Sequence, residues 1–97
     1  MARKITPLPL PESPLIDTLA EFGAHVRSMR TQMQLRIDDA AALCGVSVQL
    51  LSDLENGRRS VGLDKALTVA RQLGLSLVAI PRTELNAALS HIHKARK

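Results

Sequence analysis

Motifs that carry chemistry are scarce in this sequence. It has one cysteine, Cys44, so an internal disulfide is excluded, and a thiol in an alanine-rich helical stretch is expected to act as a small buried hydrophobic group. Glycine-rich phosphate loops, cysteine and histidine residues at metal-ligand spacings, and a nucleophile beside a base are all absent. We therefore expect no enzyme activity, no cofactor, no bound metal and no small-molecule substrate.

Long apolar runs are absent as well. No stretch approaches the roughly 18 residues that a membrane-spanning helix needs. The start Met-Ala-Arg-Lys-Ile-Thr-Pro lacks the apolar core of a signal peptide. We expect a cytoplasmic protein with no membrane partner.

Charge and length suggest an anionic partner and a small single domain. Lysine and arginine outnumber aspartate and glutamate by 13 to 9, and the sequence pI is about 10.0. This excess suits an anionic partner, although a soluble basic protein without one would show it too. A chain of this size buries only about 60 to 65% of its unfolded surface, so a small core must suffice or a second copy must help.

The N-terminal third of the chain changes character at Leu15. Four prolines in residues 1 to 14 favour a flexible, extended arm, because each fixes φ and lacks an N–H donor. Apolar residues then recur every three or four positions, which predicts a helix over residues 15 to 33. They are Leu15, Leu19, Phe22, Val26, Met29 and Met33.

Two further helices are predicted over residues 37 to 44 and 62 to 74. The first begins with Asp38 and Asp39, whose carboxylates suit the positive end of the helix dipole. Acid/base or metal chemistry at this pair is disfavoured, because neighbouring side chains on a helix do not face each other. The apolar face expected for the second helix contains Leu63, Ala66, Leu67, Ala70 and Leu73.

A short helix over residues 47 to 55 is predicted between these two. Gly45 suits the tight turn before it, Ser47 can act as its N-cap, and Gly57 ends it. We expect its inner side chains to anchor it in the core and its outer face to remain free.

The segment after residue 74 is expected to be a β-strand. Residues 75 to 80 are rich in apolar and β-branched residues, and Pro81 follows them. No second strand candidate exists in the chain, so we expect residues 75 to 81 to pair with the same strand of another copy across a two-fold axis. The dimer-contacting residues are then Leu75, Leu77, Val78 and Ile80.

Residues 82 to 97 are predicted to form an amphipathic helix and tail, with apolar residues at helical spacing and a basic end. His91 and His93 point in different directions on such a helix, so they are interpreted as surface histidines and not as a metal site.

The order of glycine turn, small polar cap, short helix and basic loop is that of a helix-turn-helix, which presents its second helix to the DNA major groove. Gly-Val-Ser at residues 45 to 47 and Leu-Glu-Asn-Gly at residues 54 to 57 carry a specific resemblance. Over residues 20 to 74 the chain resembles the Cro/C1-type (Xre-type) DNA-binding domain. The resemblance implies an all-α, lambda-repressor-like bundle of four to five helices over residues 15 to 74, to which the short C-terminal β-strand is added.

The same resemblance implies roles for individual residues. The outward positions of the recognition helix read bases in such domains, and here they are Val48, Gln49, Ser52 and Asp53. Gln49 can pair bidentately with adenine. The positions beside the DNA backbone are Arg36, Ser47, Asn56, Arg58 and Arg59. Arg30 and Glu55 match positions that form a structural ion pair in many relatives.

One position departs from the family pattern. Many relatives have Thr-Gln where this chain has Arg36 and Ile37, and that glutamine bonds to the DNA backbone. Phosphate binding at this point must then rest on Arg36 and on the N–H groups of the helix N-terminus, or be absent.

These features predict a homodimeric, sequence-specific DNA-binding repressor that binds a palindromic operator and is associated with the nucleoid. Residues 73 to 80 also resemble the strand of HipB-like antitoxins, which implies an antitoxin that autoregulates its operon and neutralises a HipA-type kinase. Two alternatives stay open. One is a free-standing or phage-type Xre repressor without a toxin, and the other is a protein-interaction adaptor that does not bind DNA.

Overall fold

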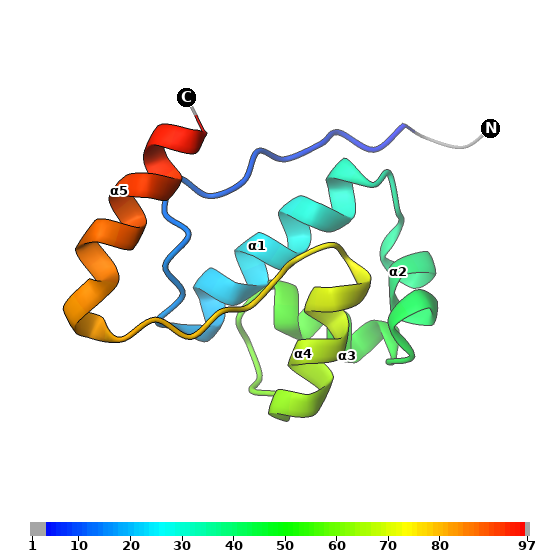
Figure 1. Cartoon of the computed structure of the whole chain (residues 1–97). Coiled ribbons are helices and arrows are strands. Elements are labelled where there is room, and N and C mark those ends of the chain that lie inside the picture. The colour runs from blue at the N-terminus through cyan, green and yellow to red at the C-terminus, as the bar shows by residue number, and fades with distance from the viewer. Residues whose placement is uncertain (1–3, 97) are drawn as a thin grey trace.

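The structure, a computed structural model, describes residues 4–96 and is all-helical in that range (Figure 1). Its elements are α1 (Leu19–Gln32), α2 (Ile37–Cys44), α3 (Val48–Glu55), α4 (Leu63–Gln72), the 3₁₀ helix η1 (Arg82–Glu84) and α5 (Leu85–Ala95). The predicted all-α bundle is confirmed. Residues 1 to 3 of the predicted arm and residue 97 of the predicted tail lie outside the described range.

The first helix begins four residues later than its apolar spacing predicts. Thr18 is the N-cap of α1: its hydroxyl accepts from the backbone N–H of Glu21, and the Glu21 carboxylate accepts from the backbone N–H of Thr18. This capping box satisfies N–H groups that a helix N-terminus leaves unpaired, and it fixes the helix start. Residues 15 to 17 continue the extended segment instead.

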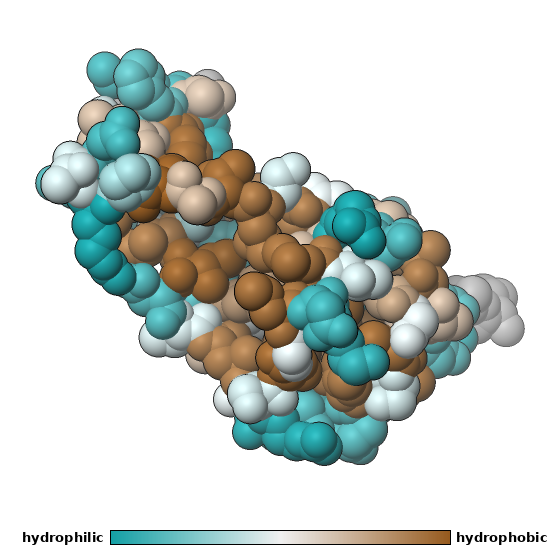
Figure 2. All heavy atoms as spheres, turned by 60° about the horizontal axis from the view of Figure 1, so that its bottom comes forward, coloured by the Kyte–Doolittle hydropathy of each residue, from teal (hydrophilic) through white to brown (hydrophobic). Residues whose placement is uncertain are grey.

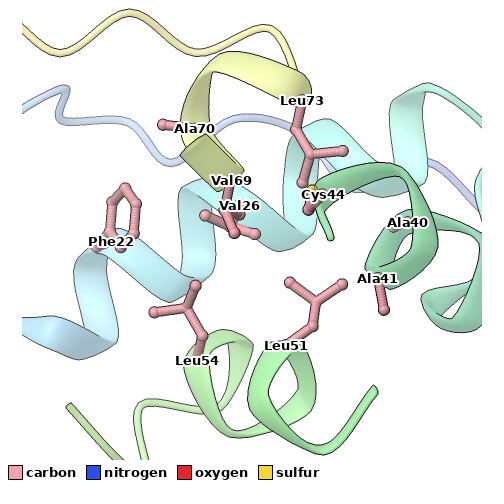
Figure 3. Packing of buried hydrophobic residues seen from close by; sticks show 10 residues of the cluster. All are labelled: Phe22, Val26, Ala40, Ala41, Cys44, Leu51, Leu54, Val69, Ala70 and Leu73. Carbon is pink, nitrogen blue, oxygen red and sulfur yellow. The ribbon is translucent and has the colours of Figure 1, made fainter. Parts of the chain in front are cut away.

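Helices α1 to α4 share one hydrophobic core, and Figure 3 shows the side chains of α3 pointing towards those of α1 and α4. The ten buried residues are Phe22, Val26, Ala40, Ala41, Cys44, Leu51, Leu54, Val69, Ala70 and Leu73. Leu51 and Leu54 anchor the inner face of α3. The buried face of α4 is rotated from the predicted one: Val69 is fully buried, whereas Leu63 is 72% exposed.

Gly23 sets the distance between α1 and α3. A Cβ atom added at this position would lie 2.1 Å from the carbonyl oxygen of Leu54 and 2.9 Å from that of Glu55. Both are backbone atoms, so no side-chain rotation can make room. The two helices can approach this closely because residue 23 has no side chain.

The predicted β-strand is not formed, and this is a correction. Residues 75 to 80 are extended, but no strand is present in residues 4–96. A strand needs a neighbouring strand to pair its backbone groups, and the described chain offers none. Among the four predicted dimer-strand residues, Leu75 and Ile80 are half-buried, while Leu77 and Val78 are 43% and 74% exposed.

The segment before α1 runs alongside that helix and is tied to it, although it was expected to be a flexible arm (Figure 1). The backbone N–H of Leu8 donates to Thr31, and the carbonyl of Leu8 accepts from Ser28. The side chain of Gln34 donates to the carbonyl of Ile5 and accepts from its N–H. Polar side chains of α1 and its C-terminal turn thus replace the strand partner that an extended segment lacks.

Helix α5 makes fewer contacts with the bundle than the other helices. None of its residues is buried, and it is joined to α4 by the extended residues 75 to 80. Near its end, Arg96 donates to the carbonyl oxygens of Pro11 and Glu12 at 3.1 and 3.4 Å. Arg82, in the 3₁₀ helix η1 that precedes α5, forms an exposed ion pair with Asp17.

Candidate nucleic-acid interface

The turn between α2 and α3 is built from Gly45 to Ser47. Gly45 has φ of 71°, in the left-handed region that favours glycine, and it ends α2. The hydroxyl of Ser47 then accepts from the backbone N–H of Leu50 at 3.0 Å and caps α3. The turn therefore fixes where α3 begins and which side chains it directs away from the core.

The outer face of α3 exposes two of the four predicted base-reading residues. Val48 is 44% exposed, Gln49 is also exposed, and Ser52 is half-buried. Leu50, between Gln49 and the buried Leu51, is half-buried. An apolar group and an amide therefore stand next to each other on the solvent side of the helix, where they are able to contact base edges.

Asp53, the fourth predicted base-reading residue, does not lie on this outer face. Its side chain is only 7% exposed. Oδ1 accepts from Nε2 of Gln49 at 3.0 Å, and Oδ2 lies 3.5 Å from Nη1 of Arg59. The family resemblance placed it on the outward face, but Arg59 from the loop after α3 reaches back to its carboxylate. The structure therefore makes Asp53 a partner of Gln49 and Arg59.

The loop after α3 carries exposed basic side chains on a fixed backbone. Gly57 has φ of 66° and reverses the chain, and the N–H of Arg58 donates to the carbonyl of Asp53 at 2.9 Å. Asn56 donates from Nδ2 to the carbonyl of Ser52 at 2.8 Å. Arg58 and Arg59 are both exposed beside the C-terminal end of α3.

The N-terminus of α2 is less open to a phosphate than the sequence suggested. Arg36 is its exposed N-cap and makes no side-chain cap hydrogen bond. The carboxylate of Asp38, however, accepts from the backbone N–H of Asp39 at 3.0 Å. One of the N–H groups that could bind a phosphate is therefore occupied by an anionic side chain.

Arg30 and Glu55 connect α1 to the end of α3. Nε of Arg30 lies 2.6 Å from Oε2 of Glu55, and Nη2 donates to Oε1 at 2.9 Å, so the pair is bidentate. Nη1 of Arg30 also donates to the carbonyl of Leu35. The side chains are 12% and 3% exposed, respectively. This ion pair holds the C-terminal end of α3 against α1.

Sequence reasoning missed two features near the site. Lys65 at the start of α4 lines a small hollow of about 210 Å³ together with Asp53 and Arg59, so a third basic residue lies near the loop. The role of Gly23 in the close approach of α1 and α3 was also missed. A glycine inside a predicted helix was the signal that could have indicated it.

A second hollow lies on another part of the surface. Figure 2 shows hydrophobic side chains gathered between α5 and the body of the molecule. The groove there has a volume of about 610 Å³, and residues from the extended segments, α1, α4 and α5 line it. Leu63, Leu77 and Val78 are among its exposed apolar residues.

Two short helices joined by a tight turn, with the second helix anchored on one face and open on the other, define a helix-turn-helix module. Comparison with known families agrees: residues 26–80 match the helix-turn-helix family HTH_3, which is more than half of the chain. The chain belongs to this family of Xre-type transcriptional regulators, whose members bind DNA.

Individual relatives are regulators of the same type. The chain is 39% identical over 62 residues to the uncharacterised HTH-type transcriptional regulator y4mF of Sinorhizobium fredii, covering 64% of this chain and 82% of that protein. Among solved structures, the restriction-modification controller protein C.AhdI of Aeromonas hydrophila is 31% identical with a TM-score of 0.56, over 60% of this chain and 84% of that one. The clp gene regulator ClgR of Corynebacterium glutamicum is 32% identical with a TM-score of 0.58, over 67% and 81%.

Within residues 4–96, none of the helices combines the length and apolar character needed to cross a membrane.

Proposed function

We propose that the protein is a sequence-specific transcriptional repressor that places α3 in the major groove of its operator at the nucleoid. The observation that supports this most strongly is the exposure of Val48 and Gln49 on a helix whose opposite face is fixed in the core. The exposed Arg58 and Arg59 lie at the end of the same helix. Contacts to phosphates fix the position of such a domain, and contacts to base edges read the sequence.

Each proposed contact uses a group that the fold leaves available. Val48 meets a thymine methyl group, and Gln49 pairs with adenine. Ser52 donates or accepts at a base edge. Ser47 accepts from Leu50 but keeps its hydroxyl hydrogen for a phosphate, and Asn56 keeps one N–H of its amide. The remaining backbone contacts come from three arginines, namely Arg36, Arg58 and Arg59.

Charge reversal separates this function from that of an adaptor that does not bind DNA. We expect Arg58→Glu to weaken binding to the DNA upstream of the protein's own gene by at least about tenfold, because it replaces a phosphate contact with repulsion. Lys94→Glu on α5 makes the same charge change far from α3 and serves as the control. Fluorescence anisotropy measures both. Equal affinity of the two variants and the wild type would favour the adaptor.

The repressor is proposed to be a homodimer. The groove between α5 and the bundle leaves Leu63 and Val78 more than 70% exposed, and burying such apolar surface against a second copy is favourable. A dimer would present two α3 helices to half-sites about one helical turn, roughly 34 Å, apart on a palindromic operator.

Sedimentation equilibrium tests the dimer. The chain of 10.5 kDa should sediment with twice that mass, and Val78→Asp should shift it to the monomer. Met33→Asp places the same charge on an apolar residue that is 44% exposed outside the groove, so it should leave the dimer intact. A wild-type monomer at micromolar concentration would contradict the proposal.

The finer proposal is that the protein acts as a HipB-like antitoxin. The strand that suggested this role is not formed in the single chain, so the proposal is now supported by the two terminal segments. Residues 4 to 18 and α5 lie wholly outside the family match. Co-expression with a kinase-like product of an adjacent gene should yield a stable complex, and DNA bearing the operator should be bound by that complex. Absence of such a partner would leave the free-standing repressor.

A further inference from the structure

Asp53 connects the recognition helix α3 to the following loop, which carries Arg58 and Arg59. Gln49 and Asp53 are four residues apart and therefore neighbours on the helix, so the amide Nε2 reaches Oδ1 at 3.0 Å. The other carboxylate oxygen lies 3.5 Å from Nη1 of Arg59. The backbone carbonyl of Asp53 accepts from the N–H of Arg58 at 2.9 Å. Each acceptor of Asp53 therefore holds a different group of the interface.

The negative charge of the Asp53 carboxylate determines the orientation of the Gln49 side-chain amide. A carboxylate only accepts hydrogen bonds, so it attracts the NH₂ end of the amide and repels the carbonyl end. Because the Asp53 side chain is 7% exposed, water competes little for its oxygens. The Gln49 amide keeps one free N–H and a free Oε1, and the hydrogen bond to Asp53 fixes the direction in which each points.

The free N–H donor and the free Oε1 acceptor of Gln49 complement the hydrogen-bonding pattern of adenine. Adenine presents the acceptor N7 and the donor N6–H₂ in the major groove, which match a donor and an acceptor on one amide. A glutamine whose amide is free to rotate must be ordered on binding, and it can also turn to present the reverse pattern. An amide held before binding loses less side-chain entropy and discriminates better.

We propose that Asp53 is a positioning residue for base recognition: it orients the Gln49 amide for adenine and links this base contact to the phosphate contact of Arg59. The inference rests on the proposed DNA-binding function. Arg59 bound to a phosphate and to Asp53 at the same time keeps the carboxylate in place, so a misplaced backbone contact disturbs the base contact too. Asp53 itself touches no DNA in this arrangement.

The test is a double-mutant cycle read by selection from a random duplex library. Asp53→Asn keeps the shape of the side chain but offers both a donor and an acceptor, so either amide orientation of Gln49 is allowed. Adenine preference at the contacted position should fall about tenfold. In a Gln49→Ala background, Asp53→Asn should change base preference no further, because it acts through Gln49. Asp17→Asn removes the same charge near α5, away from α3, and should leave base preference as in the wild type.

A second measurement uses the unmodified protein and does not depend on the variant folding. In NMR relaxation of the free protein, the side-chain amide of Gln49 should be as ordered as the backbone, whereas that of the exposed Gln72 should be mobile. Equal mobility of both amides would overturn the inference. The inference would also be overturned if Asp53→Asn did not change base preference in the wild-type background, or if it changed base preference equally with and without Gln49→Ala. A wild type without any base preference would overturn the proposed function itself, and this inference with it.

Discussion

The bidentate ion pair of Arg30 and Glu55 is the residue-scale contact that matters most for the position of α3. Both charges are largely removed from water, so the pair is stable only while each group has its partner. An exposed ion pair such as Arg82 with Asp17 contributes far less, because water and salt screen it. The two pairs therefore provide a matched comparison within one chain.

We predict that Glu55→Gln lowers the free energy of unfolding by about 3 kcal/mol, because it leaves the Arg30 charge without its partner. Arg82→Gln should lower it by less than about 1 kcal/mol. Urea unfolding followed by circular dichroism measures both. Similar small losses for the two variants would show that the Arg30 pair does not hold the helices together.

The capping box of α1 makes the stability of the fold depend on pH. The backbone N–H of Asp17, followed by the Thr18 hydroxyl and N–H, holds the pKa of Glu21 below its usual 4.5. Since the folded pKa is lower than the unfolded one, the stabilising contribution is complete above the unfolded value and is lost as the pH falls through the folded value.

We therefore predict that the wild type melts at a higher temperature than Glu21→Ala at pH 7, and that this difference shrinks as the pH is lowered below about 4. Thermal unfolding of both proteins across this range measures it. A difference that stays constant down to pH 3 would mean that the charge of Glu21 does not contribute.

At the scale of elements, helices with strong periodicity or clear turn signals could be predicted from the sequence, but the start of α1 and the rotation of α4 could not. Residues 37 to 44 follow directly from local patterns, and the helix bounds agree. Position 15 has the right spacing for a helix, but the cap at Thr18 decides the start. The inward position of Asp53 involves a contact with Arg59 in the loop that follows α3, so the family resemblance could not reveal it.

The contact between α1 and α3 yields an element-scale prediction. Gly23→Ala should lower the free energy of unfolding by at least about 3 kcal/mol, because the new Cβ meets backbone carbonyls that cannot move separately from their helix. Gly62→Ala is the matched control: its Cβ would meet only the flexible carboxylate of Asp64, so a loss below about 1 kcal/mol is expected. Chemical unfolding compares them. Equal losses would show that the helices separate easily.

At the scale of the whole molecule, the protein combines a fixed helix-turn-helix module with an N-terminal segment that runs along α1 and a C-terminal helix, α5, that borders a large apolar groove. The sequence indicated the module and its family, because turn and cap residues are local signals. It could not indicate whether residues 75 to 80 pair as a strand, since pairing depends on a partner outside the chain. The arm was expected to be flexible, and its hydrogen bonds to Ser28, Thr31 and Gln34 join residues 20 to 29 positions apart.

The most direct test of sequence-specific DNA binding is the affinity of the wild-type protein for its own upstream DNA and for a shuffled duplex, measured by fluorescence anisotropy at several salt concentrations. We predict a preference of at least about 1000-fold for the upstream duplex. If a dimer contacts about eight phosphates, the slope of log affinity against log salt should be near −7. Equal and weak binding to both duplexes, with a slope near zero, would contradict the account.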